Sequence, residues 1–405
     1  MRPREQATAA GGLTTRHAML RNANLRNATS SNPFRFGALA LDDAFTDREA
    51  EIAELRADVL SGQDVVVFAP RRYGKSSLVW RVSQRLVAEG ALVAHVDLMT
   101  TPTRARLAEK LARTIHEDVA SGLFRTRERL SVFSGLRVTP TITISPDDAT
   151  ASFAFSAGAP REDLDATLER LLELPAQLAA ERRRRAVLVL DEFQEVVDID
   201  PGLPKLMRSV FQRQPEVAHV YLGSRRHMMR RIFNDEHEPF WRSAKHMELG
   251  LIGPELFAPY VRDRFAATDR DIRPEALERL LEITRGHPYA TQELCYFLWQ
   301  ETRRGSPANE RRLELSLAAV LRSEHAHFSL LWERASAAQR LVLQALARQP
   351  GRPLSGDYRH RHRLPAASTV QRALEALERQ EIVAREGSEW TIAEPFLAAW
   401  LERLE

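Results

Sequence analysis

The 405-residue sequence contains a single cysteine, Cys295, and only four lysines among its 58 basic residues. One cysteine excludes an internal disulfide framework and a zinc site built from cysteines, and it predicts a reducing, cytoplasmic setting. No apolar stretch approaches the ~20 residues that a membrane helix needs, so we expect no membrane span. The net charge of +3 is too small to indicate a nucleic-acid partner by itself.

The N-terminal residues 1–32 are polar, with much Arg, Ala, Thr and Asn and no apolar periodicity. This composition predicts a disordered tail. An organelle-type transit peptide would have a similar composition and remains an alternative. A secretory signal is excluded because the segment has no continuous apolar region.

Residues 33–252 alternate between apolar runs and helical patterns. The run Val65–Phe68 predicts a strand that is buried on both faces, and Ala186–Leu190 one in the centre of the sheet. A further strand is expected at Val217–Leu222. Strands that alternate with helices predict an α/β fold with a mainly parallel sheet. Within this core, residues 131–158 read as two strands joined by turn chemistry, and we expect an inserted β-hairpin there.

Residues 253–330 show only helical patterns and predict a helical lid. Residues 331–405 read as two helices followed by a strand, a turn and a strand, which is the order of a winged helix. Three helix starts resemble capping boxes, in which Ser or Thr precedes Glu or Gln by three residues. These begin at Thr46, Ser336 and Ser368.

The segment after the first strand matches an eight-residue phosphate-binding loop, with Ala69 in place of the usual first glycine. Such a loop directs backbone N–H groups and a helix N-terminus at one anion. Gly74 lets the backbone approach the phosphates, Lys75 supplies a compact charge to them, and Ser76 offers a hydroxyl to Mg²⁺. Ala69 fits if its φ is negative. We therefore expect ATP to bind Ala69, Pro70, Arg71, Arg72, Tyr73, Gly74, Lys75, Ser76 and Ser77.

Two acidic residues, Asp191 and Glu192, follow the apolar run Ala186–Leu190. The carboxyl ends of parallel strands are where open sheets bind ligands. Asp191 is expected to hold Mg²⁺ together with Ser76, and Glu192 to orient or deprotonate the attacking water. Alone, the pair could be an acidic strand-to-loop junction, but together with the loop it favours nucleotide hydrolysis.

Polar residues also follow the strand at 217–222. Ser224 could contact the γ-phosphate or its water, or it could be an ordinary strand-terminal serine. Three arginines are candidates for neutralising charge in the transition state, with surface or salt-bridge roles as the alternative. These are Arg225, Arg226 and Arg242.

These elements together resemble the archaeal-type ATPase family, in the STAND branch of AAA+-like P-loop ATPases, over residues 33–300. The resemblance rests on Phe45-x-Asp47-Arg48-Glu49, Ala69–Ser76, Leu190–Gln194, Gly223-Ser224 and Gly286-His287-Pro288. It implies a P-loop NTPase core with a helical lid and a winged helix. It also implies that Arg48 and Glu49 lie near the nucleotide base, and that Gly286, His287 and Pro288 contact nucleotide from the lid. For His287, a capping or packing role is the alternative.

The run Arg359–Arg363 alternates arginine with histidine. Arginine repels cations, so the run is not a metal site. It could instead contact phosphates ahead of a recognition helix. The candidate base-reading positions are Ser368, Thr369, Gln371 and Arg372. Residues 331–405 are thus expected to bind duplex DNA or, as the alternative, a partner protein.

The sequence therefore predicts an ATP-binding, Mg²⁺-dependent P-loop ATPase that acts as a conformational switch, with a nucleotide-dependent homo-oligomer as a further expectation. A nucleotide-binding, DNA-associated regulator with little hydrolysis is the main alternative. A scaffold with an inactive nucleotide site is the third.

Overall fold

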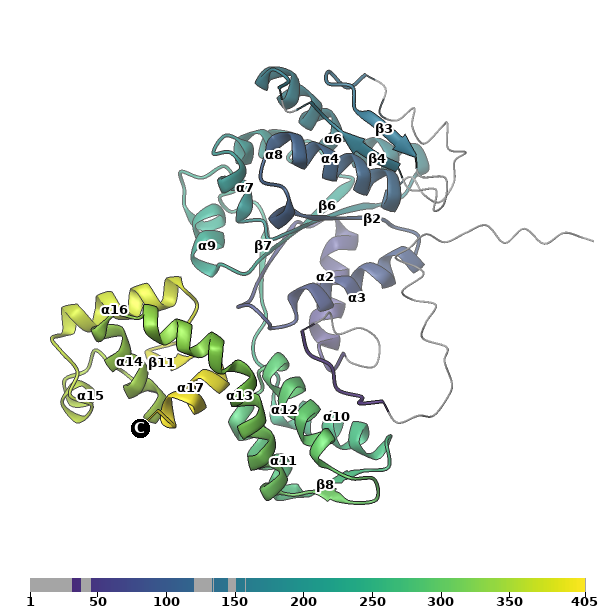
Figure 1. Cartoon of the computed structure of the whole chain (residues 1–405). Coiled ribbons are helices and arrows are strands. Elements are labelled where there is room, and N and C mark those ends of the chain that lie inside the picture. The colour runs from purple at the N-terminus through teal and green to yellow at the C-terminus, as the bar shows by residue number, and fades with distance from the viewer. Residues whose placement is uncertain are drawn as a thin grey trace, which may run out of the picture. The chain divides into compact units, whose positions relative to one another are not determined.

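A computed structural model of the chain describes residues 31–37, 45–119, 133, 135–144, 151–156 and 158–404 (Figure 1). The predicted tail, residues 1–32, lies outside the described residues apart from its last two. The chain divides into two compact units. Beyond the tail, one comprises Leu92–Leu188 and Val196–Val217, and the other Ser31–Ala91, Val189–Glu195 and Ala218–Glu405.

The central sheet has five strands in the order β2-β5-β6-β1-β7. Strand β1 pairs in parallel with β6 on one side and with β7 on the other. All residues of β1 and β6 are buried, as expected for strands covered on both faces. The arrangement confirms the predicted α/β fold class. The strands are β1 (Val65–Phe68), β2 (Leu92–Asp97), β5 (Ala186–Asp191), β6 (Val217–Gly223) and β7 (Lys245–Glu248).

The fifth strand, β7, is absent from the expectations above. Three of its four side chains are exposed, so its sequence has no apolar run. It lies at the edge of the sheet, where short strands with charged side chains, such as Lys245 here, are common. Its place in the sheet is therefore set by pairing with β1 and not by a local hydrophobic signal.

The first unit carries helices and a small hairpin. Its helices include α4 (Arg104–Thr114), α6 (Arg161–Arg182) and α8 (Leu203–Phe211). Strands β3 (Thr141–Ile144) and β4 (Ala151–Ala154) pair antiparallel within the segment expected to form a hairpin. The turn expected between them, residues 145–150, lies outside the described residues.

The second unit holds the nucleotide-loop region of the sheet and all of the C-terminal helices. Around β1 and β6 it includes α2 (Glu49–Ser61), α3 (Lys75–Ala88) and α9 (Arg226–Asn234), and α7 (Glu195–Ile199) begins at its Glu195. A helical group follows. It comprises α10 (Pro254–Ala266), α11 (Pro274–Thr284), α12 (Pro288–Glu301) and α13 (Glu310–Arg334), with the short strands β8 (Asp271–Ile272) and β9 (Pro307–Ala308).

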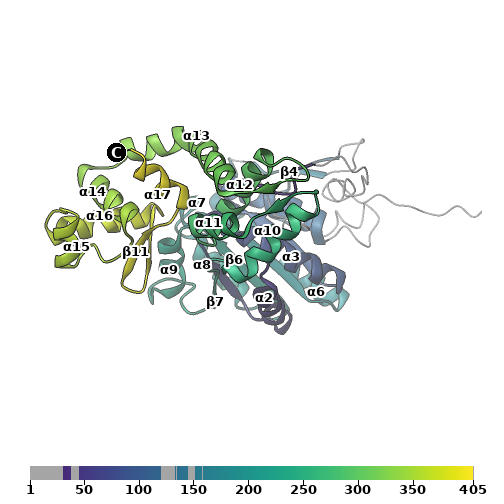
Figure 2. The same ribbon diagram turned by 90° about the horizontal axis from the view of Figure 1, so that it is seen from below.

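The C-terminal segment has the order of a winged helix, with α14, α15 and α16 followed by the antiparallel hairpin β10–β11 and then α17 (Figure 2). Its apolar core contains Val342, Leu374 and Trp390. The elements are α14 (Ala337–Arg348), α15 (Gly356–Arg361), α16 (Ala367–Arg379), β10 (Val383–Glu386), β11 (Glu389–Ile392) and α17 (Pro395–Glu402).

Of the three predicted capping boxes, one is confirmed and two are wrong. Ser336 and Gln339 cap α14 reciprocally. Helix α2 begins instead at Glu49, because Arg48 adopts a left-handed conformation with φ 72° and occupies the N-cap position. Helix α16 begins at Ala367, before Ser368, with Ala366 as its N-cap after Pro365.

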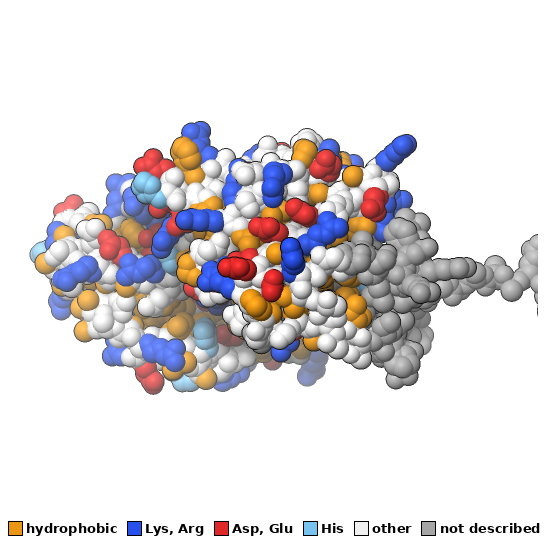
Figure 3. Space-filling model, turned by 90° about the horizontal axis from the view of Figure 1, so that it is seen from above, with side chains coloured by type: hydrophobic (Ala, Val, Ile, Leu, Met, Phe, Trp, Pro, Cys, Tyr) orange, Lys and Arg blue, Asp and Glu red, His pale blue; other side chains and the backbone are white. Residues whose placement is uncertain are grey.

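Basic and acidic side chains are interspersed on the face drawn in Figure 3. Within the described part of the chain, no helix combines the length and the apolar character that crossing a membrane requires.

Candidate nucleotide site

The phosphate-binding loop joins β1 to α3, and its backbone explains its glycine. Gly74 has φ 85° and is the N-cap of α3. Among the described residues, apart from its chain neighbours, no heavy atom lies within 4 Å of the position that a Cβ would take, so the φ angle, and not space, requires glycine. Ala69 is not among the residues with positive φ. An alanine therefore fits at this position of the loop.

Lys75 lies within this loop. Its Nζ donates hydrogen bonds to the carbonyl oxygens of Ala69 (2.7 Å) and Pro70 (3.1 Å). Burial lowers the pKa of Lys75, and the charges of Glu192, Asp191 and Glu381 partly oppose that shift. The ammonium group is thus held by the loop's own carbonyl oxygens, in the field of three carboxylates.

The two residues predicted to hold Mg²⁺ meet. Ser76, in the first turn of α3, donates a hydrogen bond from Oγ to Oδ2 of Asp191 at 3.1 Å. Asp191 is the last residue of β5 and lies 115 positions further along the chain. Mg²⁺ favours oxygen ligands and is usually held by one or two carboxylates together with substrate phosphates, so this pair fits a Mg²⁺–nucleotide complex.

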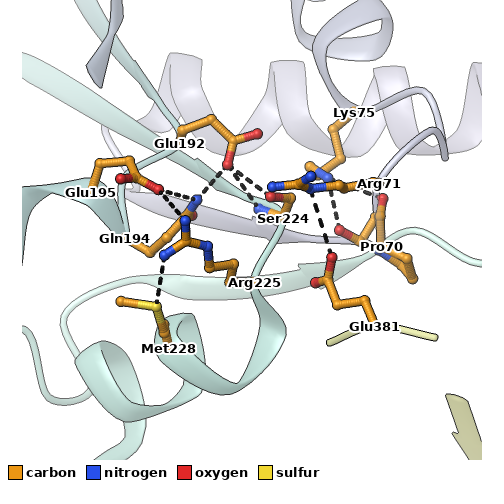
Figure 4. A network of polar contacts seen from close by, with 11 residues as sticks. Pro70, Arg71, Lys75, Glu192, Gln194, Glu195, Ser224, Arg225, Met228 and Glu381 are labelled. Carbon is orange, nitrogen blue, oxygen red and sulfur yellow. Dashed lines mark hydrogen bonds and ion pairs between the residues drawn. The ribbon is translucent and has the colours of Figure 1, made fainter. Parts of the chain in front are cut away.

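Glu192 is held in place by two polar side chains (Figure 4). Ser224 Oγ donates to Glu192 Oε2 at 2.8 Å, and the amide of Gln194 donates to the same oxygen. Burial by itself raises the pKa of Glu192, but the hydrogen bonds from Gln194 and Ser224, together with the charge of Lys75, bring it below its usual value. The carboxylate is therefore ionised at neutral pH.

Gln194 is a site residue that the sequence analysis did not single out. It is fully buried and lies in the turn that follows β5. A Cβ on Gly223 would come within 2.7 Å of the Gln194 side-chain oxygen and 2.4 Å of Met229. Gly223 thus leaves room for the side chain that positions Glu192.

The three candidate arginines have other partners. Arg225 forms an ion pair with Glu195 at 3.2 Å, and Arg226 forms one with Glu248 at 3.2 Å. The guanidinium of Arg242 lies over the Trp241 ring, 5.8 Å from its centroid. These contacts agree with the surface and salt-bridge alternative for all three arginines.

The residues expected near the nucleotide base differ in their surroundings. Arg48 is buried and donates to Glu51 and to the Gly250 carbonyl oxygen. Glu49 is largely exposed and pairs with Arg85 of α3 at 3.0 Å. Arg48 therefore ties the start of α2 to the segment after β7, whereas Glu49 faces solvent.

The Gly-His-Pro segment starts α12. Gly286 has φ 72°, and a Cβ there would lie 2.1 Å from the Ile252 carbonyl oxygen, so only glycine fits. His287 caps the helix by accepting a hydrogen bond from the Ala290 N–H at 3.2 Å. Its ring packs on Tyr73 of the loop, with centroids 4.9 Å apart.

The state of His287 follows from this position. Burial and the charge of Arg72 lower the pKa of His287 to about 4, so the ring is neutral and can accept the capping bond. His287 thus caps α12 and packs on Tyr73 of the loop. Nucleotide contact by His287 and Pro288 stays a prediction.

A strand that runs into a phosphate-binding loop, with a serine of that loop facing an aspartate at the end of another strand of the sheet, defines a P-loop nucleoside triphosphatase. A family model described as an ATPase domain predominantly from Archaea matches residues 45–247, half of the chain. A second, described as a probable winged helix domain, matches residues 326–403. The chain belongs to this family of predominantly archaeal ATPase domains and ends in a winged helix.

Solved structures are similar to the chain over most of its length. The Walker-type ATPase PABY2304 of Pyrococcus abyssi is 16% identical with a TM-score of 0.64, covering 90% of this chain and 97% of its own. The Orc1 protein of Aeropyrum pernix in complex with DNA is 15% identical with a TM-score of 0.46, covering 92% and 98%. The RuvB branch migration motor of Thermotoga maritima is 14% identical with a TM-score of 0.41, covering 88% and 94%. A search of curated proteins gives no significant match.

Proposed function

We propose that the chain binds ATP with Mg²⁺ and hydrolyses it. The observation that carries the proposal is the meeting of Ser76 Oγ and Asp191 Oδ2 at 3.1 Å beside Lys75. When bound, Mg²⁺ would neutralise charge that develops on the β- and γ-phosphates. Ser76 and Asp191 would hold it, and Lys75 with the loop amides would bind the phosphates.

The chain's own residues suit the attack of water. Glu192 is ionised and can accept a proton from water or orient it, and Ser224 and Gln194 fix the carboxylate in one position. We further propose that hydrolysis drives a conformational switch, as the resemblance to the STAND branch implies.

Replacing Lys75 tests the nucleotide site. Lys75→Ala removes the charge that faces the phosphates, and we expect about 10- to 100-fold weaker binding of ATP, the size of a lost charge-assisted hydrogen bond. Isothermal titration with a non-hydrolysable ATP analogue and Mg²⁺ measures the change. Lys205→Ala, at an exposed lysine of α8, is the matched control. Unchanged affinity in Lys75→Ala would point to the inactive scaffold.

Duplex DNA is a second candidate ligand, through the winged helix. The α15 region carries exposed Arg361 and Arg363, and α16 exposes Ser368, Gln371 and Arg372. Burial lowers the pKa of His362, and the charges of Arg361 and Arg348 lower it further. The exposed arginines Arg361, Arg363 and Arg372 are the observation that favours a phosphate backbone as the ligand.

The DNA proposal predicts a salt-dependent loss of affinity. In the full chain, Arg361→Ser with Arg363→Ser removes two phosphate contacts, so we expect the slope of log affinity against log salt to shrink by about 1–2. Fluorescence anisotropy with a duplex measures it, and Arg262→Ser, at an exposed arginine of α10, is the control. If the unaltered chain does not bind DNA even at low salt, the winged helix has another partner, such as a protein.

A further inference from the structure

The two consecutive arginines of the phosphate-binding loop each face a carboxylate from the winged-helix segment. Arg71 Nε lies 3.9 Å from Glu381 Oε2, and Arg72 Nη1 lies 3.6 Å from Glu394 Oε2 (Figure 4 shows the first pair). The arginine side chains are 61% and 41% exposed, but the glutamates only 18% and 21%. The two glutamate side chains are thus mostly buried, whereas the two arginine side chains of the loop are mostly or partly exposed.

Glu381 lies in the turn between α16 and β10 and has φ 59°. Its carboxylate accepts a hydrogen bond from the backbone N–H of Arg226, at the start of α9. Burial raises the pKa of Glu381, while the Arg226 N–H and the charges of Lys75 and Arg71 oppose the shift. The carboxylate therefore lies in the field of the same lysine and loop arginine that would contact phosphates.

Arg72 is held from two sides. Its guanidinium lies over the Tyr289 ring at 4.2 Å from the centroid, and Glu394 faces it at the start of α17. Arg72 itself has φ 66°, so the loop backbone is turned to present the side chain there. The charge of Arg72 also reaches Glu293 of α12, whose two oxygens are buried and have no hydrogen-bond partner among the residues that the structure describes. The charge of Arg72 thus acts on acidic side chains from two helices, Glu293 of α12 and Glu394 at the start of α17.

We propose that Glu381 and Glu394 act as an internal anion pair that occupies Arg71 and Arg72 in the nucleotide-free chain, and that nucleotide phosphates compete with this pair. The inference rests on the proposed nucleotide site. It adds a way in which nucleotide binding at the loop would change the contacts of the winged helix. A triphosphate carries more charge than a diphosphate, so ATP displaces the carboxylates more readily than ADP does. Release of the two ion pairs frees the winged helix from the loop.

Removing the two charges tests the competition. Glu381→Gln with Glu394→Gln keeps side-chain size, and we expect the variant to bind a non-hydrolysable ATP analogue with Mg²⁺ about 3- to 20-fold more tightly, as two partly exposed ion pairs would predict. Binding of ADP should gain less. Glu389→Gln, at an exposed glutamate of β11, is the matched control and should leave both affinities unchanged.

A distance measurement provides a second readout. Cys295 is fully buried and burial raises the pKa of its thiol, so thiol labels will attach to introduced cysteines instead. With Ala57→Cys on α2 and Ser368→Cys on α16, spin labels should report a longer distance when the ATP analogue is added. In the double glutamine variant the longer distance should appear without nucleotide.

The outcomes separate this inference from the nucleotide proposal. Unchanged affinity together with an unchanged distance in the double variant would overturn the internal anion pair, even if ATP binds and is hydrolysed. If the unaltered chain binds no nucleotide, the proposed function fails, yet a longer distance in the nucleotide-free double variant would still support the pair.

Discussion

Replacing Glu192 with glutamine is expected to lower ATP hydrolysis by about 10²- to 10⁴-fold, the usual contribution of a positioned general base. The carboxylate accepts hydrogen bonds from Ser224 and Gln194, and because its pKa lies below the usual value it is ionised at neutral pH. A glutamine has nearly the same shape but cannot accept a proton from water. Nucleotide affinity should change little, because Lys75 and the loop amides remain.

Two measurements separate chemistry from binding in this variant. Phosphate release at saturating ATP and Mg²⁺ reports turnover, and titration with a non-hydrolysable analogue reports affinity. Glu216→Gln replaces an exposed glutamate just before β6 and should match the unaltered chain in both assays. Normal phosphate release in Glu192→Gln would show that another group activates the water. Little release from either protein would favour the regulator alternative.

The central strands could be predicted because burial on both faces leaves a local signal. The runs that became β1 and β5 are continuously apolar, that of β6 is interrupted only by His219, and each strand ends within one residue of its predicted end. Strand β7 could not be found in this way, because three of its four side chains are exposed at the sheet edge. Its position depends on hydrogen bonds to β1.

Local sequence patterns also predicted only some of the helix starts. The capping box at Ser336 is confirmed, because both reciprocal bonds between Ser336 and Gln339 are present at the start of α14. At Thr46 the local pattern loses to tertiary contacts, since Arg48 turns left-handed and donates to Glu51 and Gly250. A short pattern of polar residues cannot indicate which of its members will be drawn to a distant carbonyl.

Some residues around the phosphate-binding loop could be predicted from the sequence, and others could not. Lys75, Ser76, Asp191 and Glu192 were predictable because each follows a buried strand, and parallel strands bring their carboxyl ends together. Glu381 and Glu394 were not, because they approach the loop from about 300 positions away and glutamate is common on surfaces. Only the folded chain makes them neighbours of the phosphate-binding loop.

Glutamine in place of Glu293 is expected to stabilise the fold, and only at higher pH. Burial raises the pKa of Glu293 to about 8 from 4.5, with the charges of Glu324 and Glu394 adding to the shift and Arg72 opposing it. The folded chain therefore keeps a proton that the unfolded chain releases above about pH 4.5. The free energy of unfolding consequently falls as pH rises from 4.5 to 8. Glutamine is neutral throughout and avoids this loss.

The expected gain at pH 8 is about 2–4 kcal/mol, reduced from the full linkage value to allow for some solvent screening of the carboxylate. At pH 4.5 the two proteins should agree within about 1 kcal/mol, since the carboxyl group is then neutral in the folded chain and only about half ionised in the unfolded chain. Thermal unfolding at the two pH values measures the difference. Glu301→Gln, at an exposed glutamate of the same helix, should show no pH-dependent gain. An equal offset for Glu293→Gln at both pH values would mean that packing, and not a retained proton, sets the cost of this buried acid.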